Sequence, residues 1–103
     1  MIKVNIEKNN TKINSLKVSG HSNYDEKGKD IVCAGVSAVI VGGINCLLNE
    51  NKTVIEYECK EGYSYIFVKK IDNENIQRIL DVITTQLYTI EESYPKFIKI
   101  IEK

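Results

Sequence analysis

The sequence predicts an α+β fold, in which two helices pack on a mostly antiparallel mixed sheet and the elements follow in the order ββαββαβ. Three observations support this fold class. Apolar and polar residues alternate in two segments near the start, 2–6 and 16–19, as they do in half-buried strands. An apolar segment runs from Ile31 to Leu48, and apolar residues recur with a 3.6-residue period from Ile76 to Ile90, which is typical of helices. The 103 residues are expected to form a single domain, 1–103.

The first two strands are expected to pair as an antiparallel hairpin. The first strand presents its apolar residues on one face: Ile2, Val4 and Ile6. The segment 8–11 contains two asparagines and is expected to turn the chain. The second strand, around Leu16 and Val18, ends at Gly20 and therefore places His21 at the end of the sheet.

The central helix is expected to begin after Asp30, a good N-cap residue, and to continue to Leu48. Its apolar residues are distributed over several faces, so the helix should be covered by the sheet and also by another helix or another subunit. Gly42 and Gly43 each cost about 1 kcal/mol relative to alanine inside a helix, and close packing of a partner backbone would compensate for this. We therefore expect a homodimer.

The second half of the chain predicts a hairpin, a helix and a last strand. Strands are expected at 53–59 and 63–69, joined by a turn at Lys60-Glu61-Gly62. Asp72 or Asn73 is expected to cap the second helix. This helix should end near Tyr94, because the residue before a proline disfavours helical backbone. The β-branched tail, Phe97 to Ile101, is interpreted as the last strand.

Composition and charge exclude several classes of function. Lys and Arg number 14 and Asp and Glu also 14, so no basic excess is present to neutralise phosphates, and direct nucleic-acid binding is disfavoured as the main activity. We find no charged-then-apolar leader, and no uninterrupted apolar run approaches the roughly 20 residues of a membrane span. Three cysteines form an odd set without close pairs, which argues against a disulfide framework. We expect a cytoplasmic protein with no membrane partner.

His21 and Cys33 form the candidate catalytic pair. At the third position of the helix, Cys33 lies near unpaired backbone N–H groups and the positive end of the helix dipole, and both favour the thiolate. The carboxylate of Asp30 opposes this effect. His21 is the only histidine, and it could take the thiol proton and then stabilise the anion as imidazolium. Gly20 has no side chain, so it allows another group to approach closely.

The segment between the pair is a candidate substrate loop. It is polar and contains a glycine, so the chain can double back: Ser22, Asn23, Tyr24, Asp25, Glu26, Lys27, Gly28 and Lys29. With almost no apolar anchors, it is either an ordinary surface loop or a lid that a substrate orders beside the nucleophile. In the free protein we expect a poorly ordered loop and a distance between His21 and Cys33 that is too long for a hydrogen bond.

Simpler structural roles are also open for these residues. A cysteine in an apolar helix is most often a small core residue, and His21 could be a capped surface histidine. Ser37 lies one turn beyond Cys33, where it could bond to the Cys33 carbonyl or help to orient the site. Cys46 and Cys59 are interpreted as structural. A zinc site is disfavoured because the sequence has no C-x-x-C pair, and we expect no metal or cofactor.

The segment GHSNYDEKGKDIVCAGVSAV resembles the signature of the ribosomal-processing cysteine protease family. In that signature a Gly-His pair is followed by a polar loop with glycine, by Asp-Ile-Val-Cys-Ala, and by a serine four residues after the cysteine. Length and element order also fit, so the likeness covers essentially the whole chain. The resemblance implies that Cys33 is the nucleophile and His21 the general base. It offers Asp30 as a third catalytic residue without fixing its role.

The same resemblance implies a substrate class. The family acts on the precursor of large-subunit ribosomal protein number twenty-seven and removes its short N-terminal extension before or during ribosome assembly. Two other classes of function remain open. A cysteine endopeptidase needs both His21 and Cys33, whereas a non-enzymatic ribosome-associated binding module needs neither. A thiol redox sensor needs Cys33 but tolerates the loss of His21.

Overall fold

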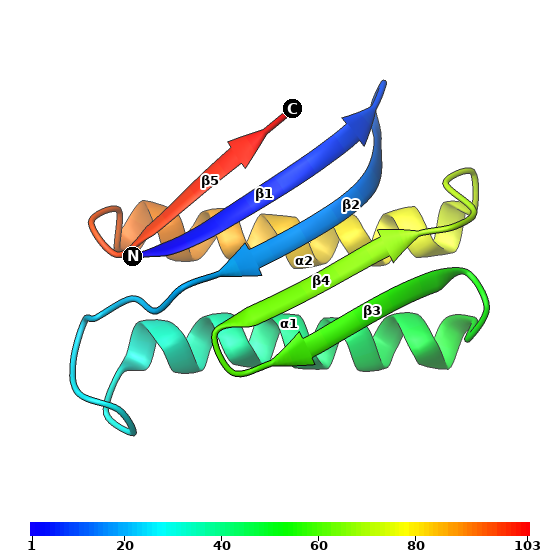
Figure 1. The fold of residues 1–103 in the computed structure, drawn as a ribbon. Coiled ribbons are helices and arrows are strands. Elements are labelled where there is room, and N and C mark those ends of the chain that lie inside the picture. The colour runs from blue at the N-terminus through cyan, green and yellow to red at the C-terminus, as the bar shows by residue number, and fades with distance from the viewer.

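A five-stranded sheet forms one layer of the computed structural model, and both helices cover the same face of this sheet (Figure 1). The structure describes residues 1–103, and the elements follow in the predicted ββαββαβ order. They are β1 (Ile2–Asn9), β2 (Lys12–Ser19), α1 (Ile31–Glu50), β3 (Ile55–Lys60), β4 (Tyr63–Val68), α2 (Glu74–Ser93) and β5 (Ile98–Glu102). The predicted α+β class is confirmed.

The strand order in the sheet is β3-β4-β2-β1-β5. The pairs β1–β2, β2–β4 and β3–β4 are antiparallel, whereas β5 runs parallel to β1 with Ile98 opposite Ile2. The sheet is therefore mixed and mostly antiparallel, as the sequence predicts. The ends of β2 and of the β3–β4 hairpin lie beside the start of α1, and this arrangement positions the site described below (Figure 1).

Two helix caps fix the helix starts. The side chain of Asp30 accepts a hydrogen bond from the Cys33 backbone N–H at 3.0 Å, so α1 begins where the sequence predicts. Of the two candidate caps for α2, Asn73 performs this role by accepting from the Ile76 N–H at 3.0 Å. Asp72 instead pairs with Lys12 at 2.7 Å. The helix α2 ends at Ser93, directly before Tyr94 and Pro95, as predicted.

The hydrophobic core lies between the sheet and the two helices. Helix α1 contributes one stripe of buried residues: Val32, Val36, Ile40, Ile44 and Leu47. Helix α1 is long and apolar enough to cross a membrane, but core helices of soluble proteins have the same length and composition. Here its apolar stripe is buried in the core.

The two helix glycines differ in their surroundings. A Cβ atom at Gly43 would lie 2.5 Å from Cδ1 of Ile83, so this glycine lets α2 approach α1 within the same chain. Nothing lies within 4 Å of the corresponding position at Gly42. The expectation that a partner backbone compensates for both glycines is therefore wrong for Gly43, where the close contact is an isoleucine side chain of this chain.

Candidate active site

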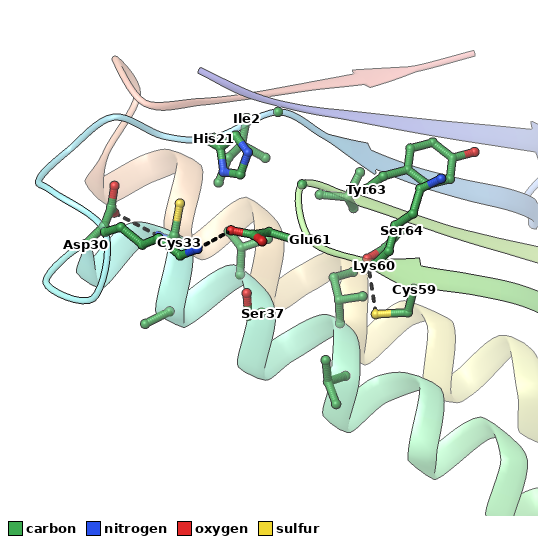
Figure 2. Close-up of a pocket in the computed structure, with 18 of the residues that line it drawn as sticks. Ile2, His21, Asp30, Cys33, Ser37, Cys59, Lys60, Glu61, Tyr63 and Ser64 are labelled. Atoms are coloured by element: carbon green, nitrogen blue, oxygen red, sulfur yellow. Dashed lines mark hydrogen bonds and ion pairs between the residues drawn. The ribbon is translucent and has the colours of Figure 1, made fainter.

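His21 and Cys33 line one pocket of about 760 Å³. Cys33 belongs to the first turn of α1, and His21 follows β2 after the single residue Gly20. The Cys33 side chain points from α1 toward the side of the pocket on which the His21 ring lies (Figure 2). The structure therefore brings the two predicted residues to one site, although eleven residues separate them in the chain.

Asp30 organises the loop between them. Its Oδ1 atom accepts from the Cys33 N–H at 3.0 Å, and its Oδ2 atom accepts from the Ser22 hydroxyl and from the N–H groups of Tyr24 and Asp25 at 3.0 and 3.3 Å. Burial raises the pKa of Asp30, but these hydrogen bonds favour the charged form and lower its pKa to about 2. The carboxylate is therefore ionised at neutral pH, and it ties the first residues of the loop to the helix start.

The sulfur of Cys33 is half-buried and contacts Ser22 twice. The Ser22 backbone N–H donates to Sγ at 3.4 Å, and the Ser22 hydroxyl oxygen lies 3.3 Å from Sγ. No hydrogen bond joins the imidazole of His21 to the sulfur. Proton transfer to His21 thus requires the two groups to approach each other.

Two glycines set the position of His21. Gly62 has a φ of +74°, and a Cβ atom there would lie 2.8 Å from Nε2 of His21, so the ring rests against bare backbone. The N–H of Gly20 donates to the Gly62 carbonyl at 3.0 Å and fixes the end of β2 to the β3–β4 turn. A Cβ atom at Gly20 would lie 2.6 Å from the Met1 carbonyl oxygen. The sequence marked Gly62 only as a turn residue, and its contact with His21 could not be foreseen.

We expect Gly62→Ala to reduce the peptide cleavage that the resemblance implies by on the order of 10- to 100-fold, because the new methyl group displaces the imidazole. The positive φ adds a destabilisation of about 1–2 kcal/mol. Asn10 also has a positive φ of 60°, in the distant β1–β2 turn, so Asn10→Ala is a control for backbone strain alone. The measurement compares kcat/KM and thermal midpoints of the two variants. Equal losses of activity would show that the contact with His21 is unimportant.

The loop has more anchors than its sequence suggests. The Tyr24 ring packs edge-on against Tyr94 and Phe97, with ring centroids 5.5 and 5.1 Å away. The expectation that the loop has almost no apolar anchor is therefore wrong, because one aromatic residue reaches the segment between α2 and β5. The other half of the loop is held only by exposed groups. Lys27 pairs with Glu61 of the β3–β4 turn at 2.9 Å.

The ion pair of Lys27 and Glu61 spans the pocket between the loop and the turn. Their hydrogen bond and opposite charges raise the pKa of Lys27 and lower that of Glu61. Both side chains are well exposed, so water and salt screen their attraction. The contact can therefore open without a large change in free energy, whereas the anchors at Asp30 and Tyr24 hold the rest of the loop.

The remaining candidate residues divide between the site and the surface. Ser37 is exposed and lines the pocket one turn beyond Cys33, and it makes no hydrogen bond to the Cys33 carbonyl. Cys59 lines the same pocket from β3, with its sulfur 3.5 Å from the Ser64 hydroxyl, whereas Cys46 is exposed on α1. The structure holds no cluster of three or more His, Cys, Asp or Glu side chains that could bind a metal ion.

A thiol at a helix start that shares a pocket with an imidazole provides the nucleophile and the base that a cysteine hydrolase uses. The family model of the cysteine protease Prp matches residues 1–99, and the chain belongs to this family. The ribosomal processing cysteine protease Prp of Staphylococcus aureus is 36% identical over 103 residues, which cover 97% of each chain. The protein of the same description from Mycoplasma genitalium is 39% identical over 104 residues, covering all of this chain and 97% of the relative.

Solved structures agree with this assignment. The essential ribosomal processing protease Prp from S. aureus, in complex with a covalently linked product peptide, superimposes with a TM-score of 0.95 at 33% identity, and the match covers both chains completely. The same protease with a substrate peptide gives a TM-score of 0.88 at 32% identity, again over both complete chains. This protein is accordingly a cysteine protease with the Prp fold.

Proposed function

We propose that this protein is an endopeptidase that removes the N-terminal extension of the precursor of large-subunit ribosomal protein number twenty-seven, with Cys33 as nucleophile and His21 as general base. The observation that carries the proposal is that His21 and Cys33 line the same pocket. The relatives are ribosomal processing proteases, and the neighbouring crystal structures contain a substrate peptide or a covalently linked product peptide. A covalent link to a product is the behaviour of an enzyme that forms an acyl intermediate.

The mechanism follows from the positions of the two groups. His21 takes the proton of the Cys33 thiol, and the sulfur attacks the scissile carbonyl to form a tetrahedral intermediate. The imidazolium then gives the proton to the leaving amine, and the C–N bond breaks to leave a thioester. Water, activated by the same imidazole, hydrolyses the thioester and releases the acid product. The N-terminus of α1, which carries the positive end of the helix dipole, and the Ser22 N–H both lie beside the sulfur.

Incubation of the purified protein with the extended precursor, followed by intact-mass determination, tests the proposal. We expect one product that lacks the extension and one short peptide, whose masses sum to that of the precursor plus water. A precursor without its extension is the control and should keep its mass. An unchanged mass of the extended precursor would contradict the proposed activity.

We propose that part of the loop becomes ordered only around the substrate. The N–H groups of Asn23, Lys27 and Gly28 have no hydrogen-bond partner in the structure, whereas those of Tyr24 and Asp25 bond to Asp30. We expect amide exchange at the three unpaired positions to slow when a peptide spanning the cleavage site is added to Cys33→Ala protein. Exchange at Tyr24 should change little, and it serves as the internal reference. Equal protection before and after addition of the peptide would show that the substrate does not order this part of the loop and that substrate selectivity resides elsewhere.

We also propose that the protein acts in the cytoplasm as a symmetric homodimer. Its three cysteines are all free, which fits a reducing compartment. On the helix layer, a hollow of about 410 Å³ is lined by small and apolar residues of both helices, among them Gly42, Cys46, Ile79 and Val82. Val82, which lines this hollow, is 56% exposed. A second copy of the same surface would cover these residues.

Sedimentation at micromolar concentration checks the dimer. We expect twice the monomer mass for the native chain and the monomer mass for Val82→Glu, because the substitution places a charge at the centre of the apolar surface. Ile101 is 40% exposed on β5, and it alternates with the buried Ile98 and Ile100, so it lies on the sheet face opposite the helices. Ile101→Glu is therefore the matched control and should stay dimeric. A native chain that sediments as a monomer would contradict the proposal.

A further inference from the structure

Ser22 occupies a position that its sequence context does not reveal. The residue is 2% exposed, although it opens a polar loop, and its side chain lies between the carboxylate of Asp30 and the sulfur of Cys33. The Tyr24 N–H also approaches the same hydroxyl oxygen at 3.4 Å. The hydroxyl therefore connects the charged cap of α1 to the candidate nucleophile.

Counting protons decides which atoms donate. An ionised carboxylate has no proton and can only accept, so the bond between Ser22 and Asp30 uses the single hydroxyl proton of Ser22. The hydroxyl oxygen then has only lone pairs left for the sulfur, which lies 3.3 Å away. The donor in this second contact must be the thiol S–H of Cys33. The arrangement thus forms a chain from Cys33 S–H to Ser22 O–H to the carboxylate of Asp30.

We propose that Ser22 is a positioning residue that accepts the thiol proton of Cys33 in a hydrogen bond and so keeps the nucleophile protonated in the free enzyme. The proposal rests on Cys33 being the nucleophile, as set out above. Ionisation breaks the S–H bond, moves the proton to the imidazole of His21, and leaves the sulfur facing a lone pair of the Ser22 oxygen. This repulsion ends only if the hydroxyl turns from Asp30 to the sulfur, at the expense of one bond to the carboxylate.

No other charged group of the pocket is linked to the sulfur by hydrogen bonds as Asp30 is through Ser22. The groups that line the same pocket and can carry charge near neutral pH are His21, Asp25, Lys27, Asp30, Lys60 and Glu61. Within α1 no charged residue precedes Glu50. Among these groups, only Asp30 is joined to the sulfur through a hydrogen-bonded atom, and that atom belongs to Ser22. Ser22→Ala removes this link while keeping the Ser22 N–H bond to the sulfur.

The rate of Cys33 alkylation by iodoacetamide, measured against pH by mass spectrometry, tests the proposal. Cys46 and Cys59 are replaced by serine in every protein used, so that Cys33 is the only thiol that iodoacetamide can alkylate. With Ser22→Ala we expect alkylation at pH 6–7 to be about 3- to 10-fold faster, because the thiol loses its acceptor, and the pH profile to move to lower pH. At high pH, where every thiol is ionised, the rates should converge. Ser15 is a buried serine of β2 outside the site, and Ser15→Ala should follow the unsubstituted profile.

A second measurement reads the proton directly. The infrared S–H stretching band should lie at lower frequency in the unsubstituted protein than in Ser22→Ala, because hydrogen bonding weakens the S–H bond. An unchanged alkylation profile in Ser22→Ala, or slower alkylation at neutral pH, would overturn the proposal, and the slower rate would mean that the hydroxyl donates to a thiolate. Either result leaves the proposed protease intact, because cleavage by the unsubstituted enzyme and its loss in Cys33→Ala are measured separately.

Discussion

Replacement of Cys33 by alanine should lower the rate of precursor cleavage by about 10⁴-fold or more, to the background of the assay. The reason is chemical, since the proposed acyl intermediate forms on the sulfur of Cys33. The fold should remain, because the side chain is only half-buried and the Cys33 backbone N–H still bonds to Asp30. Intact-mass analysis over a time course measures the cleavage, and circular dichroism with a thermal midpoint measures the fold.

The other two cysteines provide matched controls for this experiment. Cys46 is exposed on α1 and lies outside the pocket, so Cys46→Ala should remain folded and active. In the native protein, iodoacetamide should label Cys33 faster than Cys46 and Cys59 at moderately alkaline pH, below full ionisation of the thiols, because the helix dipole favours the Cys33 thiolate. Cleavage that persists in Cys33→Ala would refute the mechanism. Labelling of Cys33 no faster than that of Cys46 or Cys59 at any pH would identify it as an inert core thiol.

The sequence predicts the fold well where one local signal is strong. The alternation in Ile2–Ile6, the period of α2 and the cap at Asp30 each determine an element by themselves, and the structure agrees with all three. Boundaries are less certain where two adjacent residues offer the same chemistry. Asp72 and Asn73 are both good caps; the structure uses Asn73, whereas Asp72 pairs with Lys12, sixty residues away in the chain.

The site is predictable only in part, because its pieces meet through the tertiary structure. In the sequence, Gly62 indicates only a turn. The structure shows that the His21 ring packs on Gly62, where any side chain would displace the ring. Tyr24 looks like one more loop residue until its ring meets Tyr94 and Phe97. Ser22 likewise becomes distinctive only when the fold buries it between two functional groups. No local pattern contains these contacts.

Asp30 shows how stability and chemistry share one residue. As a helix cap it satisfies the Cys33 N–H, and as the centre of the loop it binds Ser22, Tyr24 and Asp25. Its negative charge opposes a thiolate at the same helix end, while the helix dipole favours one. The nucleophile is thus balanced between two charges of opposite sign. A general base is needed to shift this balance during catalysis, and His21 is the candidate for that role.

His21→Ala should lower kcat/KM for the precursor at neutral pH by about 10²- to 10⁴-fold, the usual contribution of a general base. The residual rate should rise steadily with pH, because hydroxide from solvent then removes the thiol proton that the imidazole no longer takes. The imidazole is exposed and rests against Gly62, so its loss leaves an open space at the fold's surface and should hardly change the thermal midpoint.

This variant also separates the three classes of function that the sequence left open. A redox sensor would keep its response to peroxide in His21→Ala, and a binding module would keep its affinity for the ribosomal precursor in both His21→Ala and Cys33→Ala without any cleavage in the native protein. For the protease, added free imidazole should enter the space beside Gly62 and restore part of the cleavage by His21→Ala, but none by Cys33→Ala, because only the first variant retains the nucleophile. Cleavage by His21→Ala at the native rate and with the native pH profile would show that another group accepts the proton of Cys33.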